Sequence, residues 1–479
     1  PSEIRNENVT TVDQARREFG VNLVLEGSLA QSGNTVRINY ALVDATKLRQ
    51  LRGDVITAQA GDPFAVEDKV VDSVIKDLDL ELQGKDRQAL VARQTNAPAA
   101  FDYYLRGRGY LQDPKPENLD NAVAVFSHAL DQDPNFSLAY AGLGEAYWQK
   151  YEHTNDGAWV QKARQACERA AALGSELAAT HTCLGTVFDG TGKYEEAVLQ
   201  FRRATELDPT SDDAVRGLGS AHEHLGKLAD AEAAYRHAIE LRPQSWMSYN
   251  MLGNFYFRHT RYDDAAKQYS QVIQLAPDSY RGYSNLGATY LALGRYSDAI
   301  VPLKHSAEIR ATASAYSNIG VAYFYQKKYE DAARMYEQAI QAEESDENQW
   351  GNLAESYYWI PQQRDKSAAT YKKAIALAED KLQVNPRDAS VLADVALYHA
   401  MLNEEAAAFE YLKRASAADP NDQEVLYKSA KVYNQFGDTT QALNYLEKSI
   451  IAGYSRVWPR DDPAFANLYK NIRFRRIVS

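Results

Sequence analysis

A repeat of 34 residues constrains this chain more than any other feature of its sequence. The pair Leu184-Gly185 returns one period on as Leu218-Gly219, and one period further as Leu252-Gly253. Self-similarity at a fixed period of this size indicates stacked supersecondary units, each packed only on its neighbours. A 34-residue unit has room for two helices and two turns, so the sequence predicts an array of helix pairs.

The residue types at fixed places within the unit explain how two such helices would cross. Glycine at the eighth position and alanine at the twentieth are small, and larger side chains there would push the helices apart and leave voids. Aromatic side chains at the eleventh and twenty-fourth positions fill the remaining space. Proline near the thirty-second position, as at Pro209 and Pro243, ends the second helix.

The register predicts a mostly α fold, a right-handed α-solenoid of about ten helix pairs over residues 101–456. We expect regular units at 178–211, 212–245, 246–279, 280–312, 313–346, 389–422 and 423–456. A further unit begins at 347, and its second helix is expected to extend to Val384. Two less regular units precede them, and the second carries an insertion around 153–159. Asp462-Pro463 is expected to open a final amphipathic helix that caps the solenoid within 457–479.

The first 81 residues differ in pattern from the repeats and predict a small α/β domain. A helix is expected over 12–19, strands over 22–29, 35–43 and 52–58, and a second helix from 62 to about 80. Gln31-Ser32-Gly33-Asn34 is a hairpin signal between the first two strands. Residues 82–100 are expected to form a helical connector.

Composition excludes several classes of function. The net charge of −12 argues against nucleic-acid binding, which requires a basic footprint. No run of about 18 apolar residues exists, so we expect no direct membrane insertion. The chain opens at Pro1 without a methionine or signal peptide, and we expect it to be a fragment of a longer protein. Its compartment and oligomeric state stay open.

The candidate catalytic and metal-binding motifs lack the residue spacing that such sites require. Gly192-Lys193 lacks both the upstream glycine and the following Ser or Thr of a phosphate loop, and no kinase catalytic-loop sequence is present. His222 falls at an aromatic core position and is interpreted as packed rather than metal-binding. Cys167 and Cys183, with no CxxC spacing, are expected to be buried small hydrophobic residues, without a disulfide or zinc. We expect no enzyme, no metal and no cofactor.

The repeats resemble the tetratricopeptide family over roughly three quarters of the chain. The segments Glu18–Ser28 and Val36–Ala45 resemble the TolB-like, FlgO-like domain, which often precedes such repeats in bacterial signalling proteins. The resemblance implies a protein-binding scaffold. The alternative that it implies is the sensory or regulatory half of a membrane-tethered bacterial serine/threonine kinase or adenylate cyclase whose catalytic domain lies outside this chain. In that alternative this chain can be the extracytoplasmic part of the membrane protein.

In the tetratricopeptide family the second, fifth, sixth, ninth and twelfth positions line the concave side of the superhelix. The sixth position holds Asn285, Asn318 and Asn352 in three successive units, which resembles the asparagine ladder that grips a peptide backbone. We expect a protein or peptide ligand in this groove. The other predicted groove residues are Asn250, Asn254, Phe257, Phe324, Tyr325, Tyr358 and Trp359. The alternative, that asparagine is simply repeat consensus there, stays open.

Overall fold

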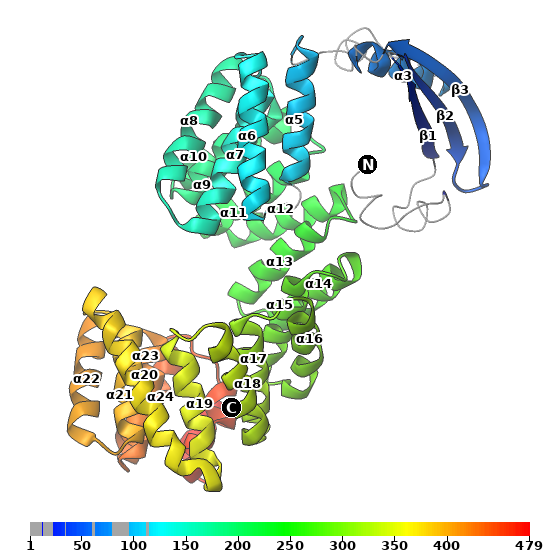
Figure 1. The fold of residues 1–479 in the computed structure, drawn as a ribbon. Helices are drawn as coiled ribbons and strands as arrows, with labels where there is room; N and C mark the ends of the chain where they lie inside the picture. The colour runs from blue at the N-terminus through cyan, green and yellow to red at the C-terminus, as the bar shows by residue number, and fades with distance from the viewer. Residues whose placement is uncertain (1–11, 13–22, 34, 60–62, 79–94, 112–114) are drawn as a thin grey trace. The chain divides into compact units, whose positions relative to one another are not determined.

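The computed structural model describes residues 12, 23–33, 35–59, 63–78, 95–111 and 115–479 (Figure 1). These fall into two compact units, residues 1–248 and 249–479. Of the predicted helix over 12–19 only one residue is described, and most of the predicted connector over 82–100 lies outside the described residues.

Among its described residues, the first unit contains an antiparallel sheet of three strands in the order β1-β2-β3. The strands are β1 (Leu23–Ser32), β2 (Thr35–Asp44) and β3 (Arg49–Gln59), followed by helix α3 (Pro63–Asp77). Tyr40 on β2 donates a hydrogen bond to Asp77 Oδ2 over 2.7 Å and so joins the sheet to α3. The strand prediction is confirmed, except that β3 begins at Arg49 rather than at 52. The reason is the tight turn after β2, where Asp44 Oδ1 accepts the backbone N–H of Thr46.

Ten consecutive helix pairs follow in the described part of the chain, as the period predicts. Those of the first unit are α5 (Pro98–Tyr110) and α6 (Pro116–Gln132), α7 (Ser137–Thr154) and α8 (Ala158–Leu173), α9 (Ala178–Gly190) and α10 (Tyr194–Leu207), and α11 (Asp212–His224) and α12 (Leu228–Leu241). His222 is 4% exposed, which confirms its core placement, and burial lowers its pKa.

The next helix, α13, starts at the end of the first unit and continues into the second, which holds the remaining pairs. They are α13 (Trp246–Arg258) and α14 (Tyr262–Leu275), α15 (Tyr280–Ala292) and α16 (Tyr296–Ile309), α17 (Ala313–Tyr325) and α18 (Tyr329–Ala342), α19 (Glu347–Trp359) and α20 (Arg364–Val384), α21 (Ala389–Met401) and α22 (Glu405–Ala418), and α23 (Gln423–Gln435) and α24 (Thr439–Ile451). Every predicted unit from 178 onward begins at the first residue of a helix.

The glycine at the eighth position makes room for the side chain at the twenty-fourth position of the same unit. A Cβ placed on Gly185 would lie 2.7 Å from the ring of Phe201, and one on Gly320 would lie 2.8 Å from the ring of Tyr336. Real Cβ atoms essentially never approach so closely, so the aromatic ring occupies the volume that the glycine leaves. This contact is the reason that the two helices of a unit can cross closely.

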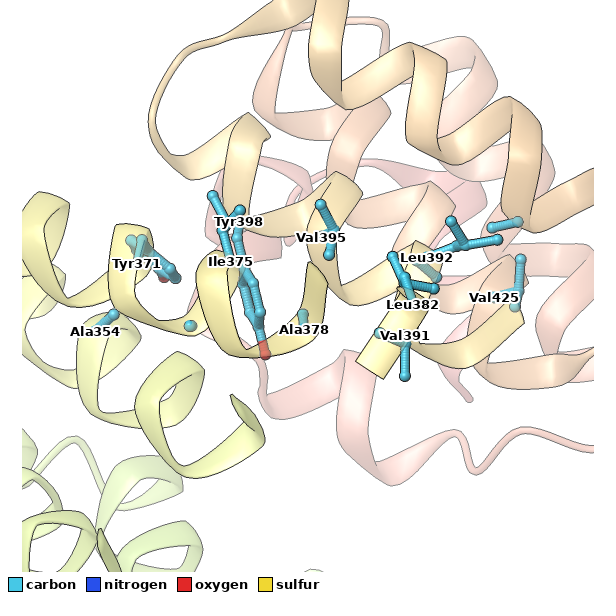
Figure 2. Close-up of a cluster of buried hydrophobic side chains, with 13 residues drawn as sticks. Ala354, Tyr371, Ile375, Ala378, Leu382, Val391, Leu392, Val395, Tyr398 and Val425 are labelled. Carbon is cyan, nitrogen blue, oxygen red and sulfur yellow. The ribbon is translucent and has the colours of Figure 1, made fainter. Parts of the chain in front are cut away.

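The core continues from one unit to the next, as Figure 2 shows for the pairs α19–α20 and α21–α22. Tyr371 on α20 and Tyr398 on α21 are buried side by side, with ring centroids 5.6 Å apart. Ile375 and Ala378 of α20 belong to the same cluster as Val395 of α21. Each unit therefore completes its core only with its neighbour, as a solenoid requires.

The end of the chain departs from the prediction of one final helix. Three short segments replace it, α25 (Val457–Asp461), a 3-10 helix η2 (Pro463–Leu468) and α26 (Ile472–Val478). Asp462 and Asn471 cap the second and third segments with side-chain hydrogen bonds, so each begins anew. Phe465 and Phe474 nevertheless pack with Tyr427 and Leu446 in one buried cluster.

The two cysteines correct a second prediction. Both are buried, as expected, but a disulfide joins Cys167 on α8 to Cys183 on α9. A Cβ on Gly144 of α7 would lie 2.6 Å from either sulfur atom, so that glycine leaves the space in which they meet. The sequence separation of 16 residues spans a helix–turn–helix, and only the packing of adjacent units brings the thiols together.

We predict that the native chain, unfolded without reductant, takes up no N-ethylmaleimide, because both thiols are bonded. After reduction it should take up two equivalents, since the sequence holds two cysteines. Intact-protein mass spectrometry measures both states. Full labelling before reduction would show that the disulfide is absent.

Among the described residues, no helix combines the length and the apolar character that crossing a membrane requires.

Candidate binding site

The predicted groove residues lie on the first helices of successive pairs. We call the surface formed by the second, fifth, sixth, ninth and twelfth positions of α13, α15, α17, α19, α21 and α23 the first-helix face. Asn285 on α15 donates a hydrogen bond to Asn250 Oδ1 on α13 over 3.2 Å, so these two predicted residues meet across neighbouring units. Asn254 accepts a hydrogen bond of 2.7 Å from the Tyr269 hydroxyl.

The next two asparagines of the row differ from Asn285. Asn318 on α17 and Asn352 on α19 are half-buried, and their side chains make no hydrogen bond within the described part of the chain. An asparagine side chain offers one acceptor and two donor hydrogens. The hydrogen-bonding groups of these two amides are therefore not used by side chains or backbone within the described part of the chain.

The predicted aromatic residues divide between core and surface. Phe324 is 6% exposed within the cluster of Ala332, Tyr336 and Tyr357, so its ring stabilises the core and is not offered to a ligand. The cause is its packing on α18, where its ring centroid lies 5.3 Å from that of Tyr329. The other predicted aromatic side chains, which are half-buried, are Phe257, Tyr325, Tyr358 and Trp359.

A polar cavity of about 240 Å³ opens on the first-helix face of the last three pairs. Asn352 and Tyr325, two of the predicted groove residues, are among its lining residues. The other lining residues were not predicted, and six of them carry charge. The charged lining residues are Glu355, Asp394, Glu424, Lys428, Lys431 and Asp462.

Lys431 is the centre of a buried ion cluster at this cavity. Its Nζ lies 2.9 Å from Glu355 Oε1 and 3.2 Å from Asp462 Oδ2. Tyr427 donates a further hydrogen bond of 2.5 Å to Asp462 Oδ2. Burial acts to lower the pKa of Lys431, but the two carboxylates outweigh it and raise that pKa, while burial raises the pKa of Glu355. Lys431 thus stays charged and compensates two buried acids.

A second pair lies beside the first. Lys428 Nζ is 2.7 Å from Asp394 Oδ1, and both side chains are largely buried. Burial raises the pKa of Asp394, and Lys428 opposes that rise. With four carboxyl groups against two ammonium groups, the cavity favours cationic or hydrogen-bonding ligand groups over anions.

The charged residues that line the cavity could have been predicted from the repeat register. Counting from the first residues of α19, α21 and α23, Glu355 and Lys431 occupy the ninth position, and Asp394 and Lys428 the sixth. These are the positions that predicted the asparagines. Charged residues therefore occupy the same helix positions as the asparagines, in the last three pairs.

Models of the tetratricopeptide repeat family match residues 184–245, 250–304, 313–346 and 424–450. The chain therefore contains tetratricopeptide repeats, and repeats of this class are typically non-catalytic scaffolds for protein–protein interaction.

Among known proteins, the chain is similar to "Putative adenylate cyclase 3" of Rhizobium meliloti (strain 1021), at 28% identity over 132 residues. That match covers 28% of this chain and 22% of the relative, so the chain matches only about a fifth of the length of that protein.

Solved structures with a similar fold include PilF of Pseudomonas aeruginosa, at 20% identity and a TM-score of 0.37, which covers 44% of this chain and 93% of that one. Another is a thermophilic tetratricopeptide repeat protein of Thermus thermophilus, at 19% identity and a TM-score of 0.31, covering 37% of this chain and 98% of that one.

Proposed function

We propose that the repeats bind an extended segment of another protein along the first-helix face, with Asn285, Asn318 and Asn352 as rungs. One observation carries the proposal. Asn434, at the twelfth position of α23, donates a hydrogen bond of 2.7 Å to the main-chain carbonyl of Ala464. An asparagine of this face thus already binds peptide backbone, supplied by the chain itself.

The chemistry of the rungs fits such a ligand. An asparagine can pair with both the N–H and the C=O of a peptide unit, so it supplies affinity without reading the ligand's side chains. Helices pack ~8–10 Å apart, so equivalent positions in successive pairs lie on the order of 10–20 Å apart. An extended chain advances ~3.3–3.6 Å per residue. Each rung would meet the ligand backbone about every third to sixth residue.

The rungs differ in what they lose on binding. Asn318 and Asn352 can accept the ligand directly, whereas Asn285 exchanges its contact with Asn250 for the new one. The half-buried rings of Tyr358 and Trp359, whose centroids lie 5.3 Å apart, supply apolar surface next to Asn352. Binding energy tends to concentrate on such aromatic anchors.

Changing Asn285, Asn318 and Asn352 together to alanine should weaken partner binding about tenfold or more, since each lost hydrogen bond costs ~0.5–1.5 kcal/mol. The partner is captured on immobilised protein, identified, purified and titrated by calorimetry against both forms. A matched control changes the exposed Gln271, Gln274 and Gln341 of the second helices to alanine and should leave affinity unchanged. Equal affinity of the asparagine variant and the native chain, at equal thermal stability, would refute the ladder.

A second function is favoured by the relative named as an adenylate cyclase. In it, the chain is the regulatory part of a bacterial signalling protein, catalyses nothing itself, and transmits partner binding to a cyclase or kinase domain. The sequence encoded upstream of Pro1 tests this directly. A catalytic domain there supports the regulatory role, and its absence removes it.

A further inference from the structure

The short helix α25 packs beside the first-helix face, against the last residue of α17, the first residue of α16 and the turn before it. Trp458 packs against Tyr325 of α17, with ring centroids 5.0 Å apart, and also approaches Tyr296 of α16 at 6.3 Å. These contacts join residues more than a hundred positions apart in the sequence. One of the predicted groove residues, Tyr325, is therefore already occupied by a side chain of the same molecule.

A polar contact accompanies the aromatic one. The Tyr296 hydroxyl donates a hydrogen bond of 2.9 Å to Asp461 Oδ2, three residues after Trp458. Burial acts to raise the pKa of Asp461, but hydrogen bonds from Arg460 and Tyr296 outweigh it, lower that pKa and keep the carboxylate ionised. On one helical turn, residues i and i+3 lie on the same side, so Trp458 and Asp461 contact the face together.

The receiving surface is shaped for this segment. A Cβ on Gly294 would lie 2.8 Å from Val457 Cγ1, so the glycine after α15 leaves the space that Val457 fills. We call Gly294, Tyr296 and Tyr325 the tail-binding surface. Its two subsites are the aromatic wall of Tyr325 and Tyr296, and the Tyr296 hydroxyl.

The segment that fills these subsites is held differently from its neighbours. Phe465, Leu468 and Phe474 are almost fully buried in the terminal cluster. In α25 only Pro459 is buried, whereas Val457, Trp458 and Asp461 are half-buried and Arg460 is exposed. The terminal segments can remain packed on α23 and α24 while α25 leaves the surface.

We propose that the tail-binding surface recognises a partner segment carrying an aromatic side chain and a carboxylate three residues later, and that Trp458 and Asp461 fill these subsites until such a partner displaces them. The proposal rests on the proposed function, binding of a protein segment to the first-helix face. It adds the chemistry of that segment and a competitor within the chain.

Competition of this kind has a measurable consequence. A tethered segment acts at an effective concentration on the order of a millimolar. The apparent affinity of an external ligand is then its intrinsic affinity multiplied by the fraction of molecules in which the surface is free. For an intrinsic dissociation constant of about 0.1 mM, occupation by the tethered segment should weaken external binding about tenfold.

The test uses the full chain and a fluorescein-labelled peptide of residues 455–462, followed by anisotropy up to millimolar protein. The variant W458A/D461N should bind the peptide about tenfold or more tightly than the native chain, because it lacks both the ring that fills the aromatic subsite and the carboxylate that accepts from Tyr296. The control I451A/E410A changes two exposed side chains away from the surface and should match the native chain. Peptide binding by W458A/D461N that is absent, or no tighter than native, overturns the proposal.

A second experiment distinguishes the loss of one contact from a general folding defect of the variant. Adding Y296F to W458A/D461N should weaken binding of the native peptide and leave binding of a peptide with alanine in place of Asp461 unchanged, since alanine offers no acceptor to the Tyr296 hydroxyl. Equal losses for both peptides would overturn the assignment of the carboxylate subsite. This outcome is independent of the asparagine rungs, so failure of the ladder and failure of the tail-binding surface are distinguished.

Discussion

Replacing Lys431 with methionine should destabilise the second unit by about 3–5 kcal/mol, the largest effect that we expect of a single substitution. The methionine fills much of the same volume, but Glu355 and Asp462 then lose the ammonium group that lies within 3.2 Å of both. Two carboxylates would remain buried near each other without a cation, and one of them must take up a proton or move. Native-state hydrogen exchange of α19, α23 and η2 measures the loss.

The matched control is Arg334→Met, which breaks an exposed ion pair with Asp331. Arg334 is 66% exposed, so this change should cost no more than about 1 kcal/mol. If K431M and R334M prove equally mild, the carboxylates at the cavity are not compensated by Lys431 in solution. A further variant, K431M combined with Glu355→Gln, should recover part of the loss, because it removes one uncompensated charge.

Replacing Gly320 with leucine should cost about 3 kcal/mol, at the upper end of the range for overpacked cores. Even a single Cβ there would lie 2.8 Å from the ring of Tyr336, which is 2% exposed and has no room to move. Thermal and urea unfolding give the size of the loss. Hydrogen exchange should place it in α17, α18 and the pairs beside them, because units of a solenoid interact only with their neighbours.

Gly109 offers the matched control for this substitution. It also lies within a first helix, α5, yet a Cβ there would meet nothing within 4 Å. Gly109→Leu should therefore be neutral or stabilising by up to ~1 kcal/mol, since leucine favours helix more than glycine does. A similar loss for both variants would show that glycine matters through the backbone alone and not through the ring at the twenty-fourth position.

The helix pairs were predictable because their signals are local. Gly320, Tyr336 and the other core positions recur within one unit at fixed spacing, and a proline or polar turn closes each helix. Contacts that depend on how units stack were not predictable. The bond between Cys167 and Cys183 forms across α8 and α9, and α25 reaches Tyr296 from 165 residues away.

The candidate site was predicted only in part. The rule of concave positions named Asn318 and Asn352, which are half-buried, but it also named Phe324, which is buried. It missed Lys431, because a charged residue on a helix is most simply interpreted as solvated. Asp462 becomes its partner only when the end of the chain folds back on α23, which no local pattern indicates.

The most direct test of the central claim, that the first-helix face holds the partner, is site-specific photo-crosslinking. Benzoylphenylalanine replaces Asn318, or Gln341 on the exposed side of α18 as a control, and the chain is irradiated with the captured partner. The account predicts a crosslink from position 318, mapped by mass spectrometry to one continuous stretch of the partner, and none from position 341. Crosslinks from position 341 alone, with none from position 318, would contradict it.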